Sequence, residues 1–195
     1  MAIRSFGVGV QTIGAASQPA FGTTLTAAST FSVDRYKGTN TPGTTTPPIT
    51  LVVASSLGMK VNDAVLVGLK ANFTPANALL LDRGLIAAVV DATHITVQGL
   101  TQNHASGEYV VLNEPAAMVQ ITPVTTTANI YVGNASTVSS TDSSTFDVIG
   151  KNATTIEPTY WSLSPPTGLG DSYNTSEFWL NGTAGDTFVA RFTQI

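Results

Sequence analysis

The chain has 195 residues, of which 43% are hydrophobic and only 10% are charged, and its formal net charge is −4. This balance indicates a folded chain, because disorder requires low hydrophobicity together with high net charge. The eight Lys and Arg residues are scattered along the sequence, so the charge pattern predicts no nucleic-acid partner.

Further classes are made unlikely by what the sequence lacks. It has no cysteine, which excludes disulfides and thiolate metal sites. No apolar run approaches the roughly 20 residues of a membrane-spanning helix, so we expect no membrane association. The first residues lack the charged start and long apolar core of a signal peptide, and any exit from a cell is expected to use another route.

Residues 1–48 are predicted to form an extended N-terminal arm. Its aromatic residues stand at wide intervals, and it ends in KGTNTPGTTTPP, which has neither a helical nor a strand period. A floppy leader is the alternative, but a solvated tail would have no use for regularly placed apolar side chains. We therefore expect the arm to bind a neighbouring subunit. The predicted contact residues are Ile3, Phe6, Val8, Val10, Phe21, Phe31 and Tyr36.

Residues 49–124 are predicted to form a small β-barrel domain. Five strand-like segments follow one another: ITLVVASS, AVLVGLK, GLIAAVVD, HITVQGL and EYVVLNEP. Turn residues separate them, as expected for hairpins, among them Asn62-Asp63, Asp91-Ala92-Thr93 and Ser106-Gly107. The segment TPANALLLDRG is predicted to hold one helical turn.

Residues 125–195 are predicted to form a second β domain, a sandwich or a barrel. Its strand-like segments are NIYVGN, STVSST, TFDVIG, TTIEPTYWSL, SEFWLNG and TFVARFTQI. In the last segment, alternation predicts that Phe188, Ala190 and Phe192 face a core while Arg191 faces the other way.

The same domain is predicted to close with a C-terminal hairpin. The pairs Asn181-Gly182 and Gly185-Asp186 suit tight reversals. Ile195 is expected to pair within the sheet, on an edge strand whose only charged guard is Arg191. An open edge invites association, so we expect the domain to oligomerise.

The two histidines offer the only candidate chemistry. Asp91, His94, His104, Ser106 and Glu108 contain the residue types of a hydrolase, but the sequence has no nucleophile elbow or oxyanion segment near them. The histidine spacing also matches no recurrent metal site. We expect no enzyme, metal or cofactor, and we interpret these residues as turn residues bonded to local backbone.

Aromatic residues gather in the C-terminal domain. Core packing is the first interpretation, because Trp and Phe in a small domain usually form its core. Stacking on a glycan, or contact with another protein, is the alternative. The candidate contacts are Tyr160, Trp161, Tyr173 and Trp179.

The segments NIYVGNASTVSST, TFDVIG and SEFWLNGTAGDTFVARFTQI resemble a terminal β domain common among structural proteins of tailed bacteriophage virions. The stretch from VNDAVLV to DATHITVQGL is similar to small barrel modules of phage head and tail proteins. With the arm, this resemblance implies a capsid decoration or cement protein on the virion surface, binding the major capsid protein, often as a homotrimer. A tail, neck or fibre protein and a glycan-binding adhesin module are the alternatives.

Overall fold

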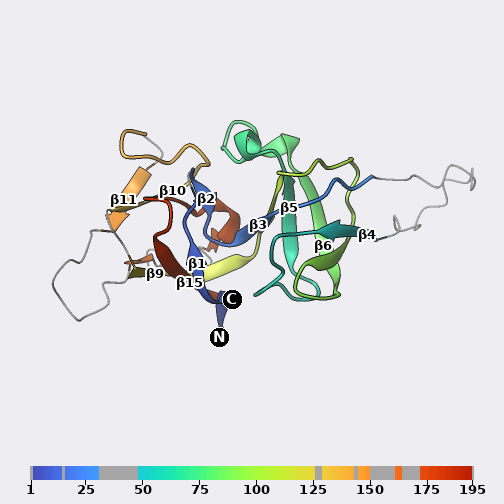
Figure 1. Cartoon of the computed structure of the whole chain (residues 1–195), viewed down its shortest axis with the longest axis horizontal. Helices are drawn as coiled ribbons and strands as arrows, with labels where there is room; N and C mark the ends of the chain where they lie inside the picture. The colour runs from blue at the N-terminus through green and yellow to red at the C-terminus, as the bar shows by residue number, and fades with distance from the viewer. Residues whose placement is uncertain are drawn as a thin grey trace, which may run out of the picture.

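The computed structural model describes residues 2–14, 16–30, 48–125, 129–142, 145–149, 161–163 and 172–194. Within these ranges the chain is all-β, as predicted, with fifteen strands and three short 3-10 turns. Figure 1 shows the strands gathered in two units that lie side by side, a sandwich and a barrel. None of the helical turns in this part of the chain has the length and apolar character needed to cross a membrane.

The barrel unit is a six-stranded antiparallel sheet in the order β3-β8-β5-β6-β7-β4. Its strands are β3 Gly22–Thr24, β4 Ile49–Val52, β5 Ala64–Gly68, β6 Asp82–Val89, β7 His94–Gln98 and β8 Tyr109–Leu112. The backbone N–H of Thr26 donates to Val52 O at 2.9 Å, and that of Ala54 donates to Thr24 O at 2.8 Å. These bonds join the two outer strands, so the sheet closes on itself.

The five strands predicted after residue 48 are all present, and their burial follows their sequence patterns. β7 alternates, with Ile95 and Val97 fully buried. β5 is apolar without alternation, and both of its faces are covered: Val65 lies in the main core, and Leu66 packs into a second cluster outside the barrel. A continuous apolar strand therefore marks the side of the barrel that another element covers.

The sandwich unit consists of two antiparallel sheets. The first has the order β1-β15-β9-β12 with β13 also paired to β9, and the second has the order β11-β10-β14-β2. The strands of the first sheet are β1 Ala2–Thr12, β9 Pro115–Thr125, β12 Trp161–Leu163, β13 Tyr173–Asn174 and β15 Thr187–Gln194. Those of the second are β2 Gln18–Pro19, β10 Ile130–Gly133, β11 Thr145–Ile149 and β14 Trp179–Asn181.

The two sheets of the sandwich bury their apolar faces against each other. Val119 and Ile121 of the first sheet share a core with Ile130 and Leu180 of the second. The predicted alternation in the last strand is confirmed, because its three core-facing residues are buried while Arg191 is exposed. STVSST, in contrast, forms turns rather than the predicted strand.

The predicted C-terminal hairpin is wrong, because its two strands lie in different sheets. β14 pairs with β10 and β2, whereas β15 pairs with β1 and β9. The loop between them is pinned to Ile13, whose N–H donates to Asp186 O at 2.7 Å and whose carbonyl accepts from Gly185 N at 2.9 Å. β15 is thus an inner strand rather than the predicted open edge, and Ile195 lies outside the described residues.

Residues 2–30 extend as predicted, but they pair with their own chain rather than reaching out as a free arm. β1 lies beside β15, with Ala2 opposite Gln194, and β2 extends the second sheet beside β14. β3 supplies the sixth barrel strand. The barrel also ends earlier than the predicted residue 124, because β9 pairs with β15 along its length. Residues 31–47 lie outside the described part of the chain.

Phe21 joins the two units. It is fully buried in the link between β2 and β3, and its ring lies edge-on to Phe178 at 6.5 Å and to Phe192 at 5.3 Å. Its carbonyl accepts a hydrogen bond from Leu112 N of the barrel at 2.9 Å. The next residue is glycine because a Cβ there would lie 2.9 Å from Val110 O. One continuous core therefore runs through both units.

A second apolar cluster seals the junction from outside the barrel. Leu66, Phe73 and Leu81 of the barrel pack with Trp179 of the sandwich. The Trp179 side chain is fully buried, with its ring centre 5.2 Å from that of Phe73 and 5.6 Å from that of Tyr109. The two units are consequently fastened at two separate places.

Replacing Phe21 with Ala should lower the free energy of unfolding by about 3–5 kcal/mol, the usual cost of truncating a buried aromatic side chain. Urea denaturation measures this change. Leu57→Ala is the matched control, because Leu57 is 42% exposed and its truncation should cost within about 0.5 kcal/mol. Equal losses for both variants would contradict the joining role of Phe21.

Candidate functional site

Three neighbouring hollows, here together called the junction groove, lie on the barrel wall and at its border with the sandwich. Their volumes are about 460, 260 and 320 Å³. Neighbouring hollows share lining residues: Leu66, Arg83 and Asn113 for the first pair, and Pro75, Asn134 and Glu177 for the second pair. The three hollows therefore lie next to one another; the first belongs to the barrel wall, and both units line the other two.

The barrel forms one wall of the junction groove through β5, β6 and β7. Alternation along β6 turns Asp82 into the protein and Arg83 out to the surface. The Arg83 guanidinium lines the groove, and no described residue forms a hydrogen bond or salt bridge with it. Gln98, at the end of β7, lines the same hollow. This wall therefore offers hydrogen-bonding groups above an apolar floor that includes Leu66.

The segment of residues 69–81, here called the leucine segment, connects β5 to β6 and forms part of the next wall. It contains two 3-10 turns, η1 Lys70–Asn72 and η2 Ala78–Leu80, seen at the top of Figure 1. Phe73 and Leu81 anchor it in the second cluster, and Asn77 Nδ2 donates to Ala71 O at 3.2 Å. The leucine segment, which contains only these two short turns, is thus held in place by packing and by a hydrogen bond.

Three leucines of the leucine segment face solvent. Leu79 is 94% exposed, and Leu69 and Leu80 are each 57% exposed. None of the three lines the junction groove. They are exposed apolar side chains of one segment outside the groove, here called the leucine surface, and two of them, Leu79 and Leu80, are adjacent in the sequence.

The sandwich forms the opposite wall through the turn η3 Thr175–Glu177. Asn174 caps this turn: its side chain accepts from the backbone of Glu177, and Glu177 Oε2 accepts from Asn174 N at 3.4 Å. Ser176 Oγ donates to Asn113 Oδ1 at 2.7 Å. Because the amide oxygen of Asn113 is engaged in this bond, its NH₂ group is left to donate elsewhere.

A buried polar network fixes η3 against the barrel. Thr175 Oγ1 donates to Leu112 O at 2.8 Å and accepts from Glu114 N at 2.9 Å. The Glu114 carboxylate accepts from Ala64 N at 2.6 Å and from Gln194 Nε2 at 2.9 Å. The start of β5, the link to β9 and the end of β15 therefore meet at one carboxylate, which holds the walls of the groove at a set spacing.

The predicted arm contacts fall into three groups: one buried residue, four residues on β1 and two residues outside the described part of the chain. Phe21 is unavailable to a partner, because it is fully buried in its own chain. Ile3, Phe6, Val8 and Val10 lie on β1, with Ile3 opposite Thr193 and Phe6 opposite Ala190, and their side chains are not described. Phe31 and Tyr36 fall outside the described residues.

Of the predicted aromatic contacts, Trp179 belongs to the core at the junction and cannot touch a ligand. Tyr173 is half-buried, lies edge-on to Phe178 at 5.8 Å and lines the third hollow. Trp161 lies on β12 with its side chain outside the description, as is the whole of Tyr160. Of the two predicted residues whose side chains are described, Tyr173 lines the junction groove and Trp179 does not.

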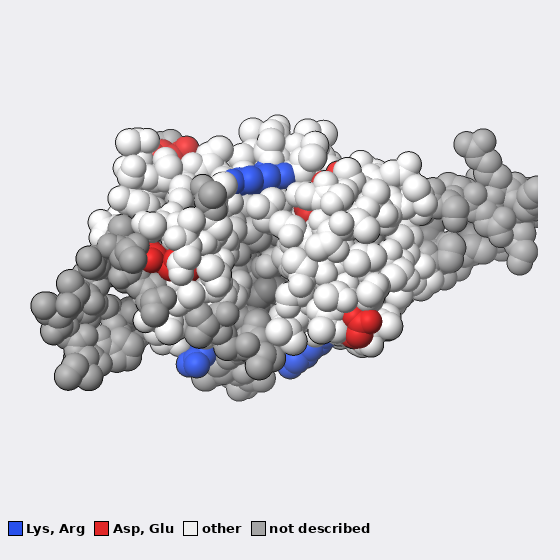
Figure 2. All heavy atoms as spheres, viewed as in Figure 1, with Lys and Arg blue, Asp and Glu red and all other residues white. Residues whose placement is uncertain are grey.

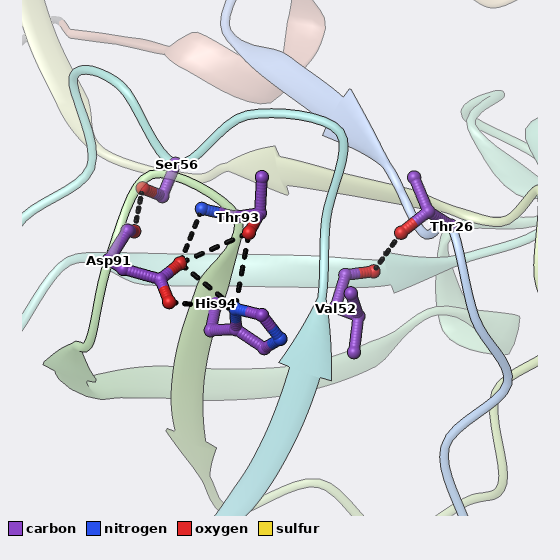
Figure 3. Close-up of polar contacts among 6 residues, drawn as sticks. All are labelled: Thr26, Val52, Ser56, Asp91, Thr93 and His94. Atoms are coloured by element: carbon purple, nitrogen blue, oxygen red, sulfur yellow. Dashed lines mark hydrogen bonds and ion pairs between the residues drawn. The ribbon is translucent and has the colours of Figure 1, made fainter.

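His94 and Asp91 belong to the turn between β6 and β7, away from the groove. Figure 3 shows the Asp91 carboxylate facing Thr93 and His94. Its Oδ1 accepts from Thr93 N at 2.7 Å and lies 2.9 Å from His94 Nδ1. The Thr93 N–H, followed by the His94 ring, lowers the pKa of Asp91 to about 2. This arrangement matches the predicted local turn bonding.

His104 differs from His94 because it is buried between two carboxylates. Its Nδ1 lies 2.8 Å from Glu108 Oε2 and its Nε2 lies 3.2 Å from Asp82 Oδ2. A protonated ring donates to both carboxylates, a neutral ring to only one. Asp82 also accepts from the backbone N–H groups of Thr101 and Gln102 at 2.7 and 2.9 Å. The cluster ties the loop after β7 to the start of β6.

The acidic and histidine side chains of the described ranges do not gather into any group of three or more suited to holding a metal ion. In the His104 cluster the reason is geometric, since the two ring nitrogens face different carboxylates. Ser106, the nucleophile considered with this cluster, donates its hydroxyl to Thr26 O at 3.1 Å.

Comparisons with models of protein families, with curated proteins and with solved structures each found no match. The site is therefore interpreted from its own residues. The groove residues Arg83, Gln98, Asn113 and Asn134 gave no sequence signal, because they come from separate strands and loops that meet only through long-range pairing. Asn113 and Asn134 each follow a strand and can be recognised as turn residues from the sequence. Asparagine is common in turns for local reasons, so this position does not indicate a binding site.

Replacing His104 with Ala should lower the free energy of unfolding by about 3–5 kcal/mol, because it leaves two buried carboxylates without their shared partner. Chemical denaturation measures the loss. His94→Ala is the matched control within the same chain, and as a surface change it should cost within about 0.5 kcal/mol. Finding the larger loss at His94 would contradict this assignment.

The Asp91 carboxyl should titrate with a midpoint near 2 when followed by NMR. Its folded pKa lies below the unfolded value, so its stabilising contribution is complete above pH 3.8 and is lost as the pH falls through about 2. His94→Ala should raise the midpoint only part of the way to the ordinary value, since the Thr93 N–H still donates. A midpoint at the ordinary value in the unmodified chain would contradict the turn geometry.

Proposed function

We propose that this chain is a non-enzymatic structural protein of a tailed-phage virion, which binds the assembled capsid and stabilises it as a decoration or cement protein. The resemblance of its C-terminal strands to virion β domains supports the virion setting. The observation that carries the binding role is the exposed leucine surface formed by Leu69, Leu79 and Leu80.

The leucine surface has the properties of a protein contact. Leu79 and Leu80 are adjacent in the sequence and both exposed, and grouped exposed apolar side chains mark interaction sites more often than isolated ones do. Burying one leucine side chain stabilises a contact by about 1.5–3 kcal/mol. The anchors Phe73 and Leu81 hold the leucine segment against Trp179, so little conformational freedom is lost when a partner covers it.

Such a contact stabilises a capsid without any turnover. A protein that binds only the assembled shell adds RT ln(1 + [L]/Kd) to its stability, about 2.7 kcal/mol when the free protein is at a hundred times its Kd. The major capsid protein is the proposed partner, because decoration proteins bind the subunits that make the shell. Because many copies bind one capsid, the small free energy added by each copy sums to a large stabilisation of the whole shell.

The contact is proposed to be mainly apolar rather than electrostatic. Figure 2 shows a face of the molecule on which charged side chains are few and separated from one another. Salt weakens contacts between exposed charges but leaves apolar contacts largely intact. Attachment to the capsid should therefore persist at high salt.

The proposal differs in two respects from the predictions for the N-terminal arm and for the homotrimer. Residues 2–30 stabilise their own chain, so removing them should unfold the protein rather than only release it from a capsid. The open C-terminal edge no longer argues for a homotrimer, because β15 is paired on both sides. A homotrimer is supported only by the resemblance to capsid decoration proteins.

A tail, neck or fibre protein is the second candidate within the same class, because an exposed apolar surface serves attachment at any of these positions. The two candidates differ in copy number. A decoration protein covers the head in many copies, whereas tail components occupy few positions.

Gold-labelled antibody against this chain, applied to intact virions that encode it, should mark the whole head surface. Label confined to the tail would replace the capsid position with the second candidate. Virions without any label would contradict a place on the particle surface.

Replacing both Leu79 and Leu80 with Ser should prevent purified protein from attaching to capsids made without it. Cosedimentation with the capsids measures attachment, and circular dichroism checks that the variant is folded. Val148→Ser is the control, because Val148 is 45% exposed but lies on β11 of the sandwich. Attachment that survives the double substitution would contradict the role of the leucine surface.

A further inference from the structure

We propose that the junction groove is a binding site for a neutral oligosaccharide. This inference does not rest on the virion setting, because it uses the lining of the groove and not the leucine surface. Four observations carry it: the hydrogen-bonding groups of the lining, the balance of charge, the fixed floor and the pairing of the strands.

The lining presents planar polar groups of both hydrogen-bonding senses. Gln98, Asn113 and Asn134 contribute amides, and Arg83 contributes a guanidinium. Within the described part of the chain, the side chains of Arg83, Gln98 and Asn134 form no hydrogen bonds. Sugar hydroxyls both donate and accept, so the free amides of Gln98 and Asn134, with the free NH₂ group of Asn113, match a set of hydroxyls.

The charge of the lining favours an uncharged ligand. Among the described residues that line the three hollows, Arg83 and Glu177 are the only charged ones, and they cancel. They form no salt bridge with each other; the Glu177 carboxylate accepts from Asn174 N, whereas the Arg83 guanidinium has no partner among the described residues. An anionic or a cationic ligand would meet a like charge at one end of the groove.

The floor of the groove is apolar and already fixed in the unbound chain. Leu66, Phe73 and Leu81 line it and are at least nine-tenths buried in the cluster around Trp179. Tyr173 lines the third hollow with part of its ring accessible. Apolar and aromatic surfaces of this kind pack against the C–H faces of sugar rings, while a preformed floor reduces the entropy lost on binding.

The strand pairing disfavours a peptide as the occupant. An extended peptide gains affinity by adding to a free sheet edge. β5 and β6 each pair on both sides within the barrel, so the barrel wall has no free edge along the groove. The amides that line the groove belong to side chains rather than to a free backbone edge. Side-chain amides can bind the hydroxyls of a sugar ring.

The test is a glycan array followed by calorimetric titration of the neutral oligosaccharides that bind. Arg83→Gln and Asn134→Ala should each weaken binding by about tenfold or more, since each removes hydrogen bonds to the ligand. Gln102→Ala is the matched control, because this exposed amide does not line the groove, and it should leave the affinity unchanged. Binding should also be nearly independent of salt.

Because Arg83 and Asn134 are exposed, both variants should unfold at the temperature of the unmodified chain. NMR shift mapping gives a second measurement that needs no substitution, and it should place the sugar on the lining residues. An array without any bound neutral glycan overturns the proposal, as does binding that both variants retain. Peptides from a display library that occupy the groove, with no sugar bound, would replace the oligosaccharide with a protein partner.

Discussion

The burial of Phe21 between the two units is the constraint on which the rest of the structure depends. This residue lies in a short link, yet its ring touches both Phe178 and Phe192 of the sandwich while its carbonyl is bonded to the barrel. The link enters the sandwich as β2 and leaves it as the sixth barrel strand, β3. Neither unit is complete without it, so the two units are expected to fold and unfold together.

This joining explains why a groove exists at the junction at all. A closed barrel packed against a sandwich leaves hollows where their surfaces diverge, and the buried contacts at Phe21 and Trp179 fix the two units beside these hollows. The Glu114 network adds a polar restraint, because one carboxylate is bonded to β5 and to β15 at the same time. The elements that carry groove residues from distant parts of the chain, such as β6 with Arg83 and the turn after β10 with Asn134, therefore stay side by side.

Local pattern predicted most strands, but long-range pairing decided their places. β7 and β15 could be predicted because alternation reports which face is buried, and that property belongs to the strand itself. The partner of a strand leaves no such mark: the NGTAGD loop suits a hairpin equally well as a crossing between sheets. The pairing of β1, β2 and β3 within their own chain could not be predicted for the same reason, since apolar residues that pair within a chain look identical in the sequence to residues that bind a neighbour.

The candidate site was harder to predict than the fold, because its residues are ordinary ones brought together by packing. A Trp ring suits both burial in a core and stacking on a sugar, so the sequence left both open for Trp179, and the structure places it in the core. Pro75, Ala78 and Leu81 of the leucine segment line the groove, whereas Leu79 and Leu80 point to solvent outside it. One segment thus contributes both to the lining of the groove and to an exposed apolar surface outside it, so the proposed protein contact and the proposed sugar site use different side chains.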